Sequence, residues 1–182
     1  MIILLHNIRS AHNVGSIFRT ADATGCEKIY LCGITPAPVD KYDRPVSRIT
    51  KVSLGAEKYI PWEKVKSTAR LINKLKKQRY QILALEQSKK SIPYYKFKLK
   101  RIKITPHSTR SSHFRYSKNV RENEKKDKFV LILGNEIKGL PCSILHRVNH
   151  ILEIPIKGKK ESFNVAVAFG IVAFHLIHTP PF

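Results

Sequence analysis

Short runs of apolar residues alternate along the chain with segments whose apolar residues recur at helical spacing. The runs have the length of buried strands, and they are Ile2–Leu5, Lys28–Cys32, Ile82–Leu85, Phe129–Leu133 and Ile151–Ile156. After the first run the spacing becomes helical, at Val14, Ile17, Phe18 and Ala21, and Gly25 is placed to end that helix. Strands that alternate with helices predict an α/β fold with a mostly parallel sheet flanked by helices.

Two further segments have helical patterns. Trp62–Arg79 reads as one amphipathic helix, with Val65, Ala69, Ile72 and Leu75 on one side and many lysines on the other. Asn164–Ile177 is apolar almost all round, so we expect it to be buried on every side, most simply against a second subunit.

Charge changes this picture most. The 182 residues include 34 Lys and Arg against 13 Asp and Glu, a net charge of +21, while 42% of the residues are hydrophobic. The apolar share is sufficient for the core of one domain, residues 1–182, and the excess of positive charge indicates a polyanionic partner: RNA, DNA or an anionic membrane surface. The longest apolar stretch, Phe163–Ile177, is too short to span a bilayer.

Cysteine usage points to a compartment. The three cysteines form no CxxC pair, so a disulfide framework is not expected, and a reducing cytoplasm is the natural location; they are Cys26, Cys32 and Cys142.

A basic insertion interrupts the alternation at about residues 98–128. Counted over residues 96–128, it holds 12 Lys and Arg against 3 Asp and Glu, a net charge of +9, with interspersed aromatic residues. It is either a solvated surface insertion or an arm whose cations bind RNA phosphates and whose aromatic rings stack on bases. A proline-rich turn region after the second strand carries further cations. The cations expected to contact RNA are Arg9, Arg44, Arg48, Lys51, Arg110 and Arg115.

Several common sites can be set aside. Gly134 and Gly139 have the spacing of half a phosphate-binding loop, but Leu140-Pro141 stands where Lys-Ser/Thr is required. The cysteine and histidines of a possible metal set straddle a predicted helix-to-strand boundary and are interpreted as structural; they are Cys142, His146 and His150. We therefore expect neither an ATPase nor a metal enzyme.

Three polar segments remain, each at or just beyond the carboxyl end of a strand, where open α/β sheets build their sites. They are Asn7–Arg19, Leu133–Pro141 and Ile154–Val165. In the first, Asn13 and Arg19 are expected on nearby faces of one helix start. In the second, Asn135-Glu136 directly follows a buried strand, where a carboxylate is hard to justify as packing. In the third, Ser162 and Asn164 begin the last helix, so capping is an alternative role for them.

These segments contain the phrases HNVGSIFRTAD, LILGNEIKGLP and IPIKGKKESFNVAVA, and ALEQS (Ala84–Ser88) lies between them. Together they resemble, in order and spacing, the signature motifs of the TrmH (SpoU) branch of the SPOUT superfamily of RNA methyltransferases. The resemblance covers nearly the whole chain except about residues 98–128.

The resemblance implies an α/β sheet whose C-terminal part forms a deep trefoil knot that holds S-adenosylmethionine (AdoMet). It also implies a homodimer with active sites shared between subunits, and methyl transfer to a ribose 2′-hydroxyl of tRNA, our preferred substrate, or of rRNA. The implied catalytic residues are Asn13, Arg19, Glu136, Ser162 and Asn164. The implied cofactor contacts are Leu85, Glu86, Gln87, Gly134, Asn135, Ile154, Ile156 and Phe163.

The chemistry of two side chains refines these roles. A guanidinium remains charged in proteins, so our hypothesis is that Arg19 holds a phosphate beside the target ribose and stabilises the developing oxyanion rather than accepting its proton. Glu136 is expected to orient Arg19 or Asn13. Two alternatives stay open: a non-catalytic RNA-binding protein on the same scaffold, and a methyltransferase acting on a base nitrogen.

Overall fold

The computed structural model describes residues 1–99 and 128–178 and contains a seven-stranded, all-parallel sheet. The strands lie in the order β3-β2-β1-β6-β4-β7-β5. Their bounds are β1 Ile2–His6, β2 Lys28–Cys32, β3 Trp62–Val65, β4 Gln81–Leu85, β5 Ile92–Pro93, β6 Phe129–Leu133 and β7 His150–Glu153. The helices are α1 Ala11–Ala23, α2 Ser47–Ser53, α3 Ala56–Tyr59, α4 Thr68–Lys77, α5 Cys142–Leu145 and α6 Val165–His178, with a 3₁₀ turn η1 at Tyr94–Lys96.

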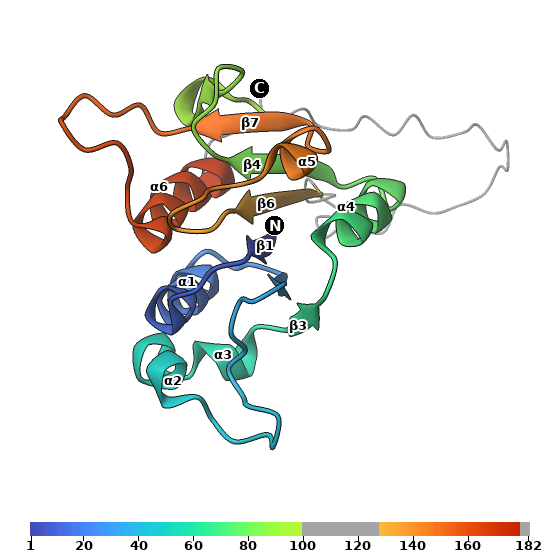
Figure 1. Cartoon of the computed structure of the whole chain (residues 1–182), viewed down its shortest axis with the longest axis vertical. Coiled ribbons are helices and arrows are strands. Elements are labelled where there is room, and N and C mark those ends of the chain that lie inside the picture. The colour runs from blue at the N-terminus through green and yellow to red at the C-terminus, as the bar shows by residue number, and fades with distance from the viewer. Residues whose placement is uncertain (100–127, 179–182) are drawn as a thin grey trace, which may run out of the picture.

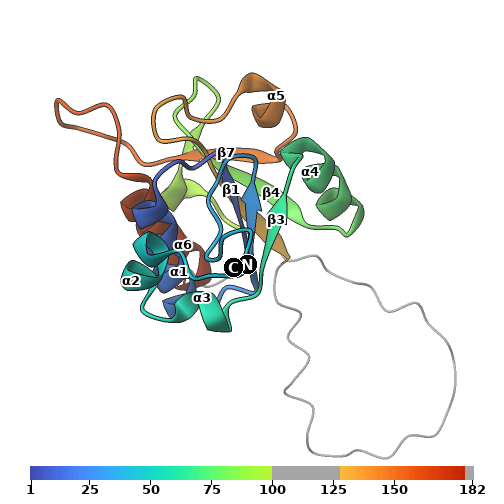
Figure 2. The same cartoon turned by 60° about the horizontal axis from the view of Figure 1, so that its bottom comes forward.

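Helices cover both faces of the sheet, as parallel strands require. Successive residues of a strand point to opposite faces, so Ile3 and Leu5 of β1 pack under α1, α2, α3 and α6, while Ile2 and Leu4 pack under α4 and α5. Figures 1 and 2 show these two helical layers on either side of the strands. Because both faces are covered, every residue of the central strand β6 is buried.

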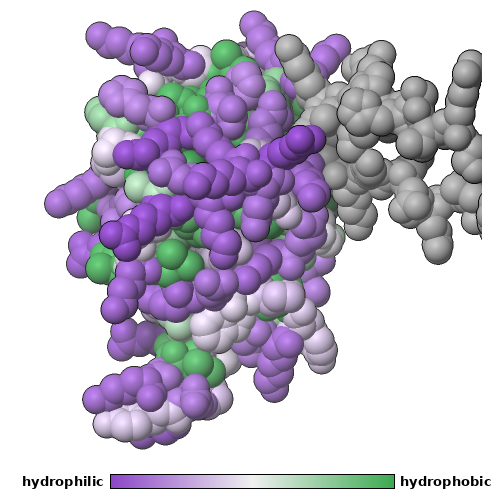
Figure 3. Space-filling view, turned by 90° about the vertical axis from the view of Figure 1, so that its right-hand side faces the viewer, coloured by the Kyte–Doolittle hydropathy of each residue, from purple (hydrophilic) through white to green (hydrophobic). Residues whose placement is uncertain are grey.

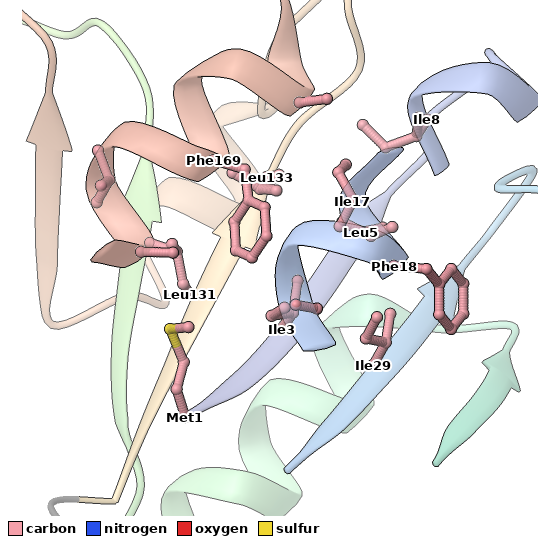
Figure 4. Packing of buried hydrophobic residues seen from close by; sticks show 14 of the residues in the cluster. Met1, Ile3, Leu5, Ile8, Ile17, Phe18, Ile29, Leu131, Leu133 and Phe169 are labelled. Atoms are coloured by element: carbon pink, nitrogen blue, oxygen red, sulfur yellow. The ribbon is translucent and has the colours of Figure 1, made fainter. Parts of the chain in front are cut away.

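The larger apolar cluster lies between the sheet and the layer that contains α1 and α6 (Figure 4). Phe18 of α1 and Phe169 of α6 are fully buried there. Their rings lie on either side of β1, Phe18 beside Ile29 of β2 and Phe169 near Leu133 of β6. This cluster fixes α1 and α6 against the sheet, and both helices begin close to the strand ends.

The predicted first helix is confirmed, and its ends follow from local chemistry. The Ser10 hydroxyl accepts a hydrogen bond from the backbone N–H of Asn13, at 3.2 Å, and so caps the helix. Gly25 adopts φ +62° just after the helix, the left-handed conformation that ends helices at low cost for glycine.

The prediction of one helix over Trp62–Arg79 is wrong at its N-terminal end. Trp62–Val65 is the edge strand β3, paired in parallel with β2, and α4 begins only at Thr68. Ser67 caps α4 by accepting a hydrogen bond from the backbone N–H of Arg70. The apolar spacing of the helix continues by chance through Val65, and pairing with β2 overrides it.

Other predicted boundaries differ by less. The last predicted strand, Ile151–Ile156, is observed at His150–Glu153, so Ile154 and Ile156 belong to the loop beyond it. The final helix is confirmed as α6. Two short helices, α2 and α3, follow the proline-rich turn and were not predicted, nor was the two-residue edge strand β5. Most of the basic insertion, from residue 100 to residue 127, lies outside the described residues.

The final helix is not enclosed on every side by its own chain. Its core side is buried, but Val167 is 52% and Phe174 42% exposed. α6 has 14 residues, whereas a bilayer core requires about 20 in a helix. No helix in the described part of the chain is both long and apolar enough to cross a membrane.

Gly15 marks the closest approach between α1 and α2. A Cβ at this position would lie 2.6 Å from the carbonyl oxygen of Ile49, which is backbone and cannot move aside. We therefore expect Gly15→Ala to destabilise the fold by about 1–3 kcal/mol through overpacking, although the same change stabilises most helices.

Gly170→Ala in α6 is the matched control. Its Cβ would meet only the Thr20 side chain, at an ordinary 3.8 Å, so we expect no loss of stability, or a gain of up to about 1 kcal/mol. Urea unfolding of both variants measures the difference, and equal stabilities would show that the helices do not meet closely at Gly15.

Candidate active site

The three polar segments converge where four adjacent parallel strands end. Because β1, β6, β4 and β7 run in the same direction, their carboxyl ends share one edge of the sheet. In register, Leu5 pairs with Leu133 and Leu133 pairs with Leu85. The loops that leave these strands are therefore neighbours, and α1 and α6 begin beside them.

The loop after β1 begins at Asn7, which is hydrogen-bonded to the loops after β2 and β6. Asn7 has φ 56°, in the left-handed region, and its side-chain oxygen accepts a hydrogen bond from the backbone N–H of Ile34 at 3.1 Å. The Asn135 side chain donates to the Asn7 carbonyl oxygen at 2.8 Å. The loops after β1 and β6 are thereby joined at their first residues.

Glu136 binds the start of the first helix. Its carboxylate accepts hydrogen bonds from the backbone N–H groups of Arg9 and Ser10, each at 3.0 Å, and from the Asn13 side-chain amide at 3.1 Å. An anion that accepts several N–H groups ahead of a helix also interacts favourably with the helix dipole. Glu136, a carboxylate that packing does not explain, thus holds the segment that begins α1.

These contacts set the protonation of Glu136. Partial burial alone would raise the pKa of its carboxyl group, but the hydrogen bonds from Arg9, Ser10 and Asn13 favour the charged form. The net result is a pKa below the ordinary value of 4.5. Glu136 is therefore a carboxylate at neutral pH, suited to orient donors and poorly suited to donate a proton.

Asn13 extends this network to the third segment. Its side chain is buried, at 8% exposure, and its carbonyl oxygen accepts a hydrogen bond from the Asn164 side-chain amide at 3.1 Å. The Asn164 side-chain oxygen accepts from the backbone N–H groups of Ala166 and Val167, at 2.9 and 3.4 Å. Asn164 thus caps α6, and at the same time it connects α6 through Asn13 to Glu136.

A second carboxylate stabilises the turn after β6. Glu86, just beyond β4, accepts hydrogen bonds from the backbone N–H groups of Leu140 at 2.7 Å and Gln87 at 3.0 Å. Gly139 has φ +62°, and a Cβ there would lie 2.4 Å from the Glu86 carboxylate. The glycine that matched half of a phosphate loop is needed for this close approach.

A cavity of about 320 Å³ lies between these loops, and we call it the strand-end cavity. All eight predicted cofactor contacts line it, together with Glu136 and Ser162. Its lining is Leu85, Glu86, Gln87, Leu133, Gly134, Asn135, Glu136, Ile137, Gly139, Ile154, Ile156, Glu161, Ser162, Phe163, Val165 and Ala168. Asn13 and Asn164 adjoin it through their bonds to Glu136 and to each other.

The expectation that Asn13 and Arg19 share nearby faces is wrong. Six residues at 3.6 per turn place two side chains about 120° apart around a helix, and Asn13 is buried whereas Arg19 is exposed. Arg19 does not line the strand-end cavity, and its guanidinium has no hydrogen bond or ion pair with any residue in the described ranges. Glu136 accordingly orients Asn13 and not Arg19.

The predicted RNA contacts have varied positions. Arg9 is exposed in the loop beside Glu136, and Arg48 and Lys51 are exposed on α2. Arg44 forms an ion pair with Asp40, at 2.8 Å. Arg110 and Arg115 lie outside the described residues.

Several other site residues have weaker signals in the sequence. Asn7 was included only as the start of a segment, although an asparagine directly after a strand is a frequent left-handed residue. Ile137 and Glu161 line the cavity because of the path of their loops, and Val165 and Ala168 because α6 begins beside it.

A larger hollow of about 560 Å³ lies at the edge of the sheet by α5 and β7, and Cys142, His146 and His150 are among its lining residues. The described residues include no group of three or more His, Cys, Asp or Glu side chains that could hold a metal ion.

The network predicts a pH-dependent contribution of Glu136 to stability. A carboxyl group whose pKa is lowered by folding stabilises the protein above its unfolded-state pKa, and this stabilisation is lost as the pH falls through the folded-state value. We expect Glu136→Gln to be less stable than the wild type at pH 7, with the difference shrinking below about pH 4.5. Urea unfolding from pH 3 to pH 7 measures it, and a difference independent of pH would contradict the charged network.

Comparison with known proteins identifies the family. Residues 1–174 match the model of the SpoU rRNA Methylase family. The chain is 25% identical over 175 residues to the tRNA (guanosine(18)-2′-O)-methyltransferase of Aquifex aeolicus, covering 96% of this chain and 67% of that protein. It is 26% identical over 172 residues to the 23S rRNA (guanosine-2′-O-)-methyltransferase of Neisseria meningitidis, covering 94% of this chain and 56% of that protein.

A solved structure agrees with this relationship. The AdoMet-bound rRNA methyltransferase of Sinorhizobium meliloti superposes with a TM-score of 0.69 at 25% identity, covering 96% of this chain and 54% of that one. The chain thus spans little more than half the length of several of its relatives. Because the family model covers nearly the whole chain, including all three segments around the strand-end cavity, the protein belongs to the SpoU rRNA Methylase family.

Proposed function

We propose that the protein is an AdoMet-dependent RNA methyltransferase that modifies a ribose 2′-hydroxyl. One observation carries the proposal: all eight expected cofactor contacts line one cavity, and the first segment is bonded to its wall through Asn13 and Glu136. The named activities of the Aquifex and Neisseria relatives, both RNA 2′-O-methyltransferases, support the reaction.

The strand-end cavity fits AdoMet in size and chemistry. Its volume of about 320 Å³ lies within the usual range for small-ligand sites. Ile154, Ile156 and Phe163 offer an apolar surface for an adenine ring, and Gly134 lets the Gly139–Leu140 backbone pack closely at the wall. Glu86 and Gln87 supply polar groups to the lining. When bound, AdoMet supplies a methyl group already activated by its sulfonium.

The residues of the chain are then needed for alignment and charge. Asn13 and Asn164 fix the relative positions of α1 and α6, and Ser162 offers a hydroxyl at the cavity wall for positioning the ribose. Glu136 keeps this arrangement rigid. Alignment of the nucleophile with an activated methyl group accounts for much of the rate enhancement in such a reaction.

Arg19 is proposed to act on the RNA. Its exposed guanidinium is free of ion pairs with described residues and can bind the phosphate beside the target ribose and stabilise the developing oxyanion. Because it lies outside the cavity of its own chain, we propose that it completes the site of a second subunit. The exposed apolar side chains near α6 support a homodimer; they are Ile137, Phe163, Val167 and Phe174.

Further features of the proposal follow from the family resemblance. Residues 1–182 form one domain with the basic insertion, and its C-terminal part threads as a trefoil knot. The contacts of Glu86 with Leu140 and of Gln87 with the Glu161 carbonyl oxygen, at 2.7 and 2.8 Å, support a compact arrangement of these loops.

The location and the substrate are further parts of the proposal. The free cysteines suit a cytoplasmic location. Transfer RNA is the preferred substrate, with ribosomal RNA as the alternative.

Methyl transfer tests the function directly. Wild-type protein, labelled AdoMet and unmodified tRNA or rRNA should yield a 2′-O-methylated nucleoside, and Arg19→Ala should lose at least about a hundredfold in rate while it still binds AdoMet. A methylated base would instead establish the base-nitrogen alternative. RNA binding without any transfer would favour the non-catalytic scaffold.

Cofactor binding has its own test. A Cβ on Gly134 would lie 2.7 Å from the carbonyl carbon of Gly139 and 2.8 Å from the backbone nitrogen of Leu140. Gly134→Ala should therefore distort the cavity wall and weaken AdoMet binding about tenfold or more, a loss of about 1.4 kcal/mol. Isothermal titration calorimetry measures it, with Gly170→Ala as the control, and an unchanged Kd would argue against AdoMet in this cavity.

A further inference from the structure

A cationic surface lies on the side of the sheet opposite α1 and α2, away from Arg48 and Lys51 of α2. Between residues 64 and 85 the sequence has seven Lys and Arg and no Asp or Glu. Six of them are exposed on α4 and its flanking residues, and we call this set the α4 cationic surface: Lys66, Arg70, Lys74, Lys76, Lys77 and Arg79. None of them is among the residues that the sequence motifs suggested for RNA binding.

α4 has an apolar side that packs on the sheet and a charged side that faces outward. Leu71, Ile72 and Leu75 are buried against the sheet, so the polar side of α4 faces outward. Arg70, Lys74 and Lys77 stand at i, i+4 and i+7, and therefore form one stripe about 10 Å long. Figure 3 views this side of the molecule, where hydrophilic side chains predominate.

The charge on this surface is uncompensated. No ion pair within the described ranges involves any of its six cations, and the neighbouring carboxylate, Glu63, already pairs with Lys28 at 2.7 Å. A surface selected only for solubility mixes charges of both signs. An uninterrupted field of one sign instead attracts a polyanion and increases its rate of association.

One end of the surface is fixed to the proposed active site. The Thr68 hydroxyl, at the start of α4, hydrogen-bonds the His6 ring at 2.8 Å, and His6 is the last residue of β1 before the loop that Glu136 binds. Lys64 donates to the carbonyl oxygen of Thr35, whose hydroxyl accepts from the backbone N–H of Ile8 at 3.0 Å. A polyanion on α4 therefore has a defined position relative to the strand-end cavity.

The other end continues to a further cation. Lys128 lies beside Tyr80, with its ammonium group 5.7 Å from the ring centroid, and its carbonyl oxygen accepts from the backbone N–H of Gln81 at 2.9 Å. The α4 cationic surface thus continues from Lys66, before α4, to Lys128, directly before β6.

We propose that the α4 cationic surface binds the sugar-phosphate backbone of the substrate RNA at some distance from the methylated nucleotide. The inference rests on the proposed function, because it assigns a partner surface to the same enzyme. RNA fits better than a membrane, since the described residues 64–79 include no exposed large apolar side chain of the kind that inserts into lipid. Phosphate binding by such a surface adds affinity without base specificity.

The test neutralises the stripe and measures both binding and turnover. In the triple variant Arg70→Gln, Lys74→Gln and Lys77→Gln, we expect the Kd for a mixture of unmodified tRNA and rRNA to rise about tenfold or more at low salt. The slope of log Kobs against log salt should become shallower by about 2 to 3, because each lost phosphate contact removes about 0.7–0.9. The KM for RNA should rise, while kcat and the Kd for AdoMet stay unchanged.

The matched control removes the same charge elsewhere. Lys58→Gln, Lys89→Gln and Lys90→Gln change three exposed lysines outside α4 and outside the basic insertion, and we expect a much smaller change of slope. Equal effects of the two triple variants, or an unchanged salt slope in the α4 variant, would overturn the inference. So would a loss of binding to phosphatidylserine vesicles with RNA binding intact.

Failure of the proposed function is recognised separately. If the wild type transfers no methyl group to any RNA, the enzyme assignment fails whatever α4 does. If the wild type methylates RNA and the α4 variant has wild-type KM and salt slope, only the α4 surface is wrong.

Discussion

The structure of the site depends on the carboxylate of Glu136. It accepts two backbone N–H groups and one side-chain amide from the segment that begins α1, and through Asn13 and Asn164 the same network reaches the start of α6. The segment that begins α1 is thus held to two segments more than a hundred residues further along the chain by a network centred on one charged group. Asn13 is the buried member of this network, and leaving its amide unsatisfied costs about 1–3 kcal/mol, so the network favours one arrangement of the loops.

The sheet makes this network possible. With all seven strands parallel, every strand delivers its carboxyl end to the same edge, and the order β1-β6-β4-β7 makes the three loops neighbours. β1 and β6 are buried on both faces and paired in register, which holds the strand ends in place. The sheet and the hydrogen-bonded loops at its carboxyl edge form the cavity before any ligand binds. A preformed cavity lowers the entropy cost of binding a ligand.

The sequence predicted the parts of this arrangement that depend on local pattern or motif. The central strands, α1, α6 and all eight cavity residues were identified correctly as neighbours in space, although their role as cofactor contacts stays a prediction. The predictions that were wrong concern features that depend on tertiary contacts. Trp62–Val65 is a strand because it pairs with β2, but it was predicted as helix because its apolar spacing continues that of α4. Arg19 was expected beside Asn13, but helix geometry places it about 120° away on an exposed side of α1, so its part in the site stays a prediction.

The central claim is that Glu136 acts through Asn13 to hold the site together. A double-mutant cycle of Glu136→Ala and Asn13→Ala, followed by the free energy of unfolding at pH 7, tests it most directly. We predict a coupling energy of at least about 1 kcal/mol, because each variant removes the same interaction. Effects that add to within about 0.3–0.5 kcal/mol would contradict it, since they would show that the two side chains stabilise the fold independently.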